Sequence, residues 1–194
     1  MAALPPLPSP IALFPPFQTQ TPQTLILREK ILSLSGDDFH ITLASGAPLL
    51  RVSGNVLSLS GRKKVFDEQG VHLFDIVKER WHLHATFRVE DKEGKGLVEV
   101  RSELKLVGSK ATARFTSLAG RQEVLGMKGN WLDSAADIVD ESSGAVVARI
   151  DRKLLSGRDL FAGQQTYAVT VAPGADMALV AALCICLDEK NNEK

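Results

Sequence analysis

The sequence of 194 residues is poor in cysteine and carries no net charge. Its two cysteines, Cys184 and Cys186, lie two positions apart in a stretch that we expect to be helical. Their side chains then point to different sides and should not form a disulfide. Basic and acidic residues number 23 each, so no global charge favours nucleic acid as a partner. We therefore expect a reducing compartment, no nucleic-acid binding, and basic surface only where it is local.

The amino terminus lacks the features of targeting segments. No Lys or Arg precedes Arg28, which excludes the basic region of a secretory signal and the arginines of a transit peptide. Residue 2 is Ala, which excludes N-myristoylation. These absences predict a cytoplasmic protein, with peripheral membrane association left open.

Motifs of common enzyme classes are also missing. The sequence has no phosphate loop and no Gly-x-Ser-x-Gly elbow. Gly94 and Gly96 begin a dinucleotide fingerprint, but the third glycine and the following helix are absent. We expect no catalytic residue, no cofactor and no enzymatic activity.

Histidines and paired acids have simpler explanations than a metal site or a catalytic pair. His82 and His84 would share one face of a strand and could bind a metal together, but no third ligand is evident. The pairs Asp67–Glu68 and Asp140–Glu141 fall at predicted turns, where carboxylates accept hydrogen bonds from the turn backbone. We predict no metal site.

One apolar run stands out near the end of the chain, from Met177 to Leu187. A helix that is apolar on every side has to be buried in lipid or in protein. At ~1.5 Å per residue the run covers roughly half of the ~30 Å hydrocarbon core of a bilayer. Asp176 can cap its start, and Asp188, Glu189 and Lys190 close it. The run therefore predicts a core helix at about 176–188 and no transmembrane span.

Residues 25–171 consist of short alternating runs broken by Gly, Asp and Ser, which is typical of antiparallel strands. Four segments have the outline of a β-hairpin around a turn glycine: Phe39–Val52 around Gly46, Val65–Val77 around Gly70, Phe87–Val100 around Gly94 and Ile138–Ile150 around Gly144. At roughly 12 residues per strand and turn, the region accommodates about a dozen strands. Because side chains nearly fill an eight-stranded barrel, enclosing a helix ~10 Å wide requires more strands. We predict a mainly β fold, a 12-stranded antiparallel β-barrel enclosing a hydrophobic C-terminal α-helix.

Prolines crowd the beginning of the chain: Pro5, Pro6, Pro8, Pro10, Pro15, Pro16 and Pro22. This composition suits extended, polyproline-like structure and not helix. We predict a proline-rich N-terminal arm at 1–24, followed by one β-barrel domain at 25–194. Whether the arm is loose, docks on the barrel or offers a proline ligand to another protein stays open.

Several segments resemble the LURP-one-related family. The run Gln165–Asp176 and the apolar helix up to Glu189 are similar to its carboxyl-terminal signature. Leu57–Lys63 and Ala148–Lys153 resemble patterns of its first and second halves. The likeness covers about residues 25–189 and leaves only the arm outside.

The resemblance implies the tubby C-terminal-like fold, a twelve-stranded barrel around a hydrophobic helix that is shared with tubby proteins and phospholipid scramblases. Functions diverge within this superfamily. Tubby domains bind phosphoinositides, scramblases are linked to lipid movement and calcium, and plant LURP-one proteins are associated with pathogen defence. No position here matches a tubby lipid-binding motif, so no residue roles are carried over. Fold alone does not assign the function.

Basic residues form one local cluster on the otherwise neutral body. Its members are Arg62, Lys63, Lys64, Lys78 and Arg80. Cationic donors on strands joined by a hairpin could bind a lipid headgroup, whereas charges on a solvated barrel exterior are the plain alternative. The cluster leads to the hypothesis of a non-enzymatic adaptor that binds anionic phospholipid, such as phosphoinositide, or a protein partner.

Two other functions remain as alternatives. The first is a protein-interaction scaffold that recruits partners through the proline-rich arm. The second is a small-molecule carrier or an enzyme, which is disfavoured because the predicted helix fills the barrel interior.

Overall fold

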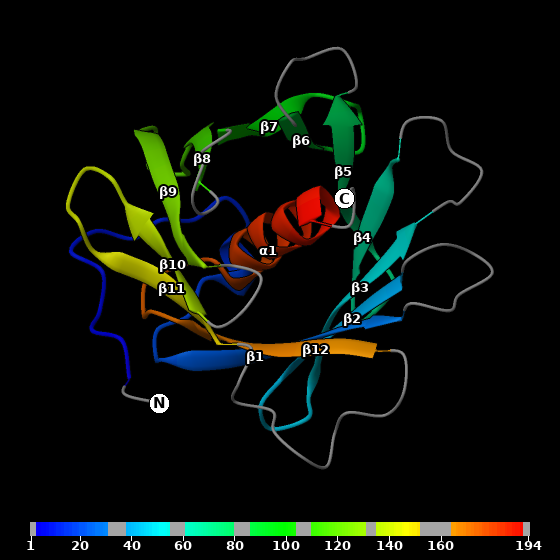
Figure 1. Ribbon diagram of the computed structural model, residues 1–194, viewed down its shortest axis with the longest axis horizontal. Coiled ribbons are helices and arrows are strands. Elements are labelled where there is room, and N and C mark those ends of the chain that lie inside the picture. Colours follow the sequence, from blue (N-terminus) through cyan, green and yellow to red (C-terminus); the bar gives the residue numbers. More distant parts are fainter. Residues whose placement is uncertain are drawn as a thin grey trace.

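The computed structural model describes residues 3–30, 38–54, 61–79, 86–103, 110–130, 135–151 and 164–191. Twelve strands form a closed barrel around one α-helix (Figure 1). Strands that follow one another in the chain pair antiparallel, and β1 pairs antiparallel with β12 to close the barrel. The prediction of a mainly β barrel around a C-terminal helix is confirmed.

The described residues form one short 3-10 helix, twelve strands and one α-helix. The elements are η1 (Pro15–Phe17), β1 (Gln23–Lys30), β2 (Asp38–Leu43), β3 (Pro48–Gly54), β4 (Lys63–Asp67), β5 (His72–Glu79), β6 (Thr86–Glu90), β7 (Gly96–Glu103), β8 (Lys110–Thr116), β9 (Gln122–Asn130), β10 (Ala135–Asp140), β11 (Val146–Asp151), β12 (Gln164–Val171) and α1 (Met177–Asn191). Side chains alternate between the interior and the exterior, as the buried Leu25 and Leu27 beside the exposed Arg28 illustrate on β1.

The four predicted hairpins are present, each with its glycine at positive φ. Gly46, Gly70, Gly94 and Gly144 have φ between 74° and 89°. A fifth turn of this kind joins β8 and β9 at Gly120, with φ 73°, and was not among the four predicted segments. All five turns lie at the end of the barrel where α1 begins, because consecutive strands run in opposite directions.

Acids at these turns accept backbone hydrogen bonds, as the sequence pattern predicts. Asp67 Oδ1 accepts from Val71 N at 2.7 Å, and Asp140 Oδ1 accepts from Ser142 N at 3.0 Å. Burial alone would raise the pKa of Asp140, but hydrogen bonds from Ser143 and Ser142 outweigh it and lower the pKa. Turn formation therefore accounts for both acids.

The helix is buried from Ala178 to Leu187, with Ala178, Leu183 and Ile185 fully inaccessible. It continues to Asn191, so the prediction that Asp188, Glu189 and Lys190 close it was wrong. The barrel supplies partners for these polar residues. Asp188, only 3% exposed, accepts a hydrogen bond from Tyr167 Oη, and Glu189 pairs with Lys63.

The described part of the arm packs across the end of the barrel where α1 begins. Ile11 and Phe17 are buried, and Phe14 stacks on Phe74 with ring centroids 4.8 Å apart. Ile11 N donates to Gly174 O at 3.0 Å, and Thr19 N donates to Ala175 O at 3.0 Å. The arm thus docks on the barrel, one of the three possibilities that its sequence leaves open.

Asp176 connects the arm to the helix. Oδ1 caps α1 by accepting from Ala178 N at 2.9 Å and Leu179 N at 3.1 Å, as predicted. Oδ2 accepts from Leu13 N at 2.9 Å and Phe14 N at 2.6 Å. Burial raises the pKa of Asp176, while these four donors act in the opposite direction.

Candidate ligand-binding surface

The structure separates the basic residues that the sequence groups together. Lys63 faces the barrel interior, where its Nζ lies 3.1 Å from Glu189 Oε1, and only 6% of its side chain is exposed. Lys78 shares the inward side of β5 with Phe74 and Ile76, and is half-buried. Lys64 is exposed. Arg80 lies outside the described residues.

Arg62 faces the exterior but its charge is balanced. Its guanidinium donates to Asp75 Oδ2 at 2.5 Å and to Glu90 Oε2 at 3.0 Å. The hydrogen bond with Asp75 is the main reason that the pKa of Arg62 is raised. Asp75 also contacts His72 Nε2 at 2.6 Å, and Glu90 accepts from Arg88 at 2.8 Å. This part of the exterior is a network of satisfied opposite charges.

A different basic surface lies on the outside of β1, β2 and β3. Arg28 pairs in register with His40, and His40 pairs with Arg51, so the three side chains form one row across neighbouring strands. All three are exposed. We call this set the cationic row. The sequence prediction missed it because its members are more than ten positions apart and meet only through strand register.

The arginines of the cationic row differ from most others on the barrel. Neither Arg28 nor Arg51 has a carboxylate at ion-pair distance among the described residues. The same is true of Arg114 on β8. The other described arginines are held by acids: Arg62 by Asp75 and Glu90, Arg88 by Glu79 and Glu90, Arg101 by Glu99, Arg121 by Glu123 and Arg149 by Asp137. The cationic row therefore combines two unbalanced guanidinium groups at one place.

Phe66 extends the cationic row onto β4. It pairs in register with Arg51, whose Cζ lies 4.9 Å from the centroid of the phenyl ring. His72 on β5 pairs with Phe66 from the other side, at 5.4 Å between ring centroids. The contact with the ring favours one position of the Arg51 guanidinium over a freely moving side chain.

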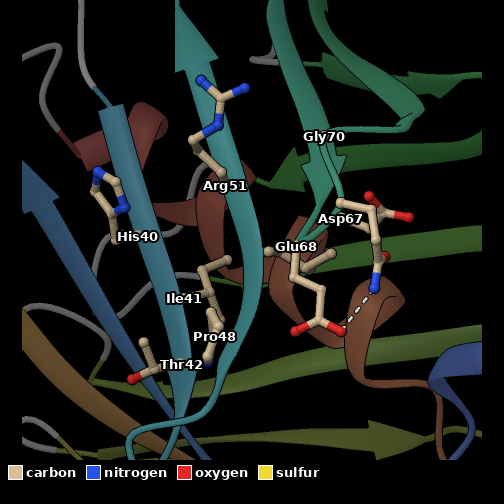
Figure 2. A pocket seen from close by; sticks show the side chains of 10 residues that line it. His40, Ile41, Thr42, Pro48, Arg51, Asp67, Glu68 and Gly70 are labelled. Atoms are coloured by element: carbon tan, nitrogen blue, oxygen red, sulfur yellow. Dashed lines mark hydrogen bonds between the residues drawn. The ribbon is translucent and has the colours of Figure 1, made fainter.

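A hollow of about 350 Å³ adjoins the cationic row. Figure 2 shows His40 and Thr42 on β2, Arg51 on β3, Asp67 at the end of β4 and Glu68 in the turn after it around this hollow. Ile41, Pro48, Leu50, Gln69 and Gly70 complete its lining. Glu68 Oε1 accepts from Gln69 Nε2 at 2.8 Å, the contact drawn as a dashed line. Charged side chains of both signs thus surround a concave part of the surface.

Other candidates for chemistry do not converge on a site in the described structure. Cys184 and Cys186 are buried in α1, and burial raises the pKa of the Cys186 thiol, which disfavours the reactive thiolate. His82 and His84 lie outside the described residues. Among the residues that are described, no three His, Cys, Asp or Glu side chains come together as a metal site.

Comparison with protein families finds a match that covers the barrel and most of the helix. The family model described as LURP-one-related matches residues 23–188, which includes all twelve strands and most of α1. The chain belongs to the LURP-one-related family. This membership confirms the resemblance that the sequence motifs indicated. It does not assign a specific function to this LURP-one-related protein.

Similar proteins come from Arabidopsis thaliana. Protein LURP-one-related 15 is 24% identical over 189 residues, covering 94% of this chain and 87% of the relative. Protein LURP-one-related 10 is 23% identical over 186 residues, covering 92% and 95%. An X-ray structure of a protein from Arabidopsis thaliana shares the fold, with a TM-score of 0.67, 21% identity and coverage of 94% of this chain and 99% of that chain.

The two helices that the structure describes in this LURP-one-related chain are short. In the part of the chain that the structure describes, no helix has the length and hydropathy needed to cross a bilayer, and α1 itself has 15 residues.

Proposed function

We propose that the protein is a non-enzymatic binding protein that engages anionic phospholipid headgroups through the cationic row of Arg28, His40 and Arg51. The observation that carries this proposal is a pair of guanidinium groups, Arg28 and Arg51, that flank His40 and have no carboxylate partner among the described residues. His40 and Arg51 also line the hollow. Guanidinium groups donate paired hydrogen bonds to phosphate oxygens. Desolvating them costs less where no ion pair has to be broken first.

The spacing of the row suits a headgroup surface. Neighbouring strands lie ~4.8 Å apart, so Arg28 and Arg51 are separated by about 10 Å at the backbone. Two arginine side chains at that distance can reach the phosphates of adjacent lipids. Attraction between exposed cations and an anionic surface decreases with salt, so binding should be salt-sensitive.

The sequence-predicted cluster enters this proposal only in part. Lys64 is exposed on β4, on the same outer side as Phe66 and two residues from it, so it adds a positive charge near the cationic row without being in register with it. Arg62 contributes little net charge because Asp75 and Glu90 hold it. Lys63 and Lys78 face inward, and Arg80 is undescribed. The lipid-binding role of the five residues that the sequence groups together thus stays a prediction. The present proposal places the main contacts with lipid at Arg28 and Arg51.

Vesicle co-sedimentation tests the proposal. The variant Arg28→Gln with Arg51→Gln should lose most binding to vesicles containing phosphatidylserine or phosphoinositide at low salt. Its matched control is Arg101→Gln with Arg149→Gln, which removes the same charge from arginines already paired with Glu99 and Asp137. If both double variants bind equally, the cationic row is not the binding surface.

A second candidate function rests on how the arm is oriented. Leu4 is buried at 6% exposure and Leu7 is half-buried, whereas Pro5, Pro6 and Pro8 are exposed. Docking on the barrel would pre-order these prolines for a partner domain with an aromatic groove, because less conformational entropy is lost on binding.

Titration with purified SH3 and WW domains tests this alternative. The variant Pro5→Ala with Pro8→Ala should abolish binding, while Pro22→Ala, at an exposed proline next to β1, should leave it unchanged. Deleting residues 1–22 would confound the test, because it removes the buried Ile11 and Phe17 and two donors to Asp176.

A further inference from the structure

The hollow beside the cationic row carries charges of opposite sign on two sides. His40 and Arg51 lie on one side, and Glu68 and Asp67 lie on the other, at the turn between β4 and β5 (Figure 2). Arg51 and Glu68 do not neutralise each other, since no ion pair joins them and Glu68 has the Gln69 amide as its hydrogen-bond partner in the described structure. The hollow therefore presents a cation and a carboxylate to the same ligand.

Strand geometry sets the distance between the two charges. Phe66 is the register partner of Arg51, and Glu68 follows two residues later, one step nearer the turn. Because Glu68 lies in the turn after β4, the step of two residues from Phe66 covers at most ~6.7 Å, the length of two residues of extended chain. A ligand that satisfies both sides is thus a dipole with its charges several ångströms apart.

Headgroups with several phosphates do not match this arrangement. A phosphate that approached Glu68 or Asp67 would meet a like charge, which disfavours binding. A group with one phosphate and one ammonium meets an opposite charge on each side. The volume of about 350 Å³ equals roughly ten waters, which accommodates such a group with some of its hydration.

We propose that the hollow binds an amine-bearing phosphate, such as a phosphoserine or phosphoethanolamine group, with the phosphate at His40 and Arg51 and the ammonium at Glu68. This inference rests on the proposed function and names the headgroup that the same surface selects. The source of the group is either an aminophospholipid or a soluble aminoalkyl phosphate.

Phosphatidylserine and phosphatidylglycerol vesicles provide the decisive comparison, because both lipids have a net charge of minus one and only the first has an amine. At equal mole fraction, the protein should bind phosphatidylserine roughly five- to tenfold more tightly, as expected for one charge-assisted hydrogen bond at a half-open site. Glu68→Gln should remove this preference by weakening phosphatidylserine binding and leaving phosphatidylglycerol binding equal or stronger.

The control variant is Glu93→Gln, which removes the same charge from an exposed acid at the turn between β6 and β7. A surface that attracts anions only by net charge predicts the opposite result, with Glu68→Gln and Glu93→Gln both strengthening binding to every anionic vesicle. That result, or equal affinity of the unaltered protein for the two lipids, overturns the inference and leaves the proposed function intact. Failure to bind any anionic vesicle overturns the proposed function itself.

Soluble O-phosphoserine and O-phosphoethanolamine identify the source of the ligand. Calorimetric binding of either compound that is lost in Glu68→Gln, without vesicle binding, supports the ligand class at the hollow and assigns a soluble source, while it overturns the proposed binding to phospholipid. Binding to vesicles with the same loss, and none to the soluble compounds, supports the class and assigns the lipid. Absence of both responses to Glu68→Gln overturns the inference.

Discussion

The two ends of the barrel hold the helix by different means. Where α1 begins, one buried carboxylate, Asp176, accepts four backbone N–H groups, two from the helix and two from the arm. Where α1 ends, side chains meet in pairs: Tyr167 with Asp188, and Lys63 with Glu189. The first end concentrates four side-chain contacts on one residue that joins the arm to the helix, and the second distributes its contacts over separate pairs. The comparison predicts unequal sensitivity to substitution.

The largest effect should come from Asp176→Ala. The change leaves four backbone donors without their acceptor at a fully buried position, so we expect a loss of about 3 kcal/mol in the free energy of unfolding. Urea denaturation measures it. Asp91→Ala is the control, because Asp91 Oδ1 accepts two backbone N–H groups at a more open turn and should cost about 1 kcal/mol. Equal losses of unfolding free energy in the two variants would show that Asp176 contributes no more than an acid at an ordinary turn.

At the opposite end, Lys63→Met should cost about 2 kcal/mol. The substitution preserves the apolar stem but leaves the Glu189 carboxylate, 22% exposed, without its cation. Adding Glu189→Gln should recover part of the loss, and a double-mutant cycle measures the coupling. If the two losses simply add, the ion pair does not stabilise this end.

Tyr167→Phe should have a smaller effect, of about 1.5 kcal/mol. It removes the hydrogen bond from Tyr167 Oη to the buried Asp188 while leaving the aromatic packing in place. Thermal unfolding at neutral pH measures the change. A loss comparable to that of Asp176→Ala would show that this end also depends on a single residue.

The smallest effect concerns pH at the turn between β10 and β11. Because Ser143 and Ser142 lower the pKa of Asp140, the ionised carboxyl stabilises the folded state above the ordinary value of 3.8, and this contribution is lost as pH falls through the lowered pKa. Ser143→Ala should raise the pKa of Asp140 and cost about 0.5 kcal/mol at pH 7. NMR titration of the Asp140 carboxyl checks the direction, and a pKa that stays in place would contradict it.

Local patterns were sufficient to predict strands, the helix and four hairpins, because each depends on alternation, a turn glycine or an apolar run within a short window. The closed barrel followed from the number of strands and the width of the helix. The same alternation contained a signal about Lys63. It shares a strand face with Val65, so an interior position follows from spacing alone, but adjacency to Arg62 and Lys64 suggested one exterior cluster.

The candidate surface could not be predicted in the same way. Arg28, His40 and Arg51 meet through the register of β1, β2 and β3, which the isolated sequence does not determine. The neutralisation of Arg62 likewise depends on Glu90, a residue two strands away in the sheet. The end of α1 was misplaced because Asp188 and Glu189 find partners only inside the assembled barrel.

Closure of the barrel between β1 and β12 also affects how the chain can fold. Gln23 on β1 pairs with Val171 on β12, which is synthesised much later. β1 therefore lacks this partner during most of synthesis, and α1 is synthesised after β12. Pairings of such long sequence separation are slow to form. Until α1 inserts, the apolar interior of the sheet and the unpaired side of β1 are open to other chains. A ribosome-bound chain of this protein would therefore need protection that the finished barrel no longer requires.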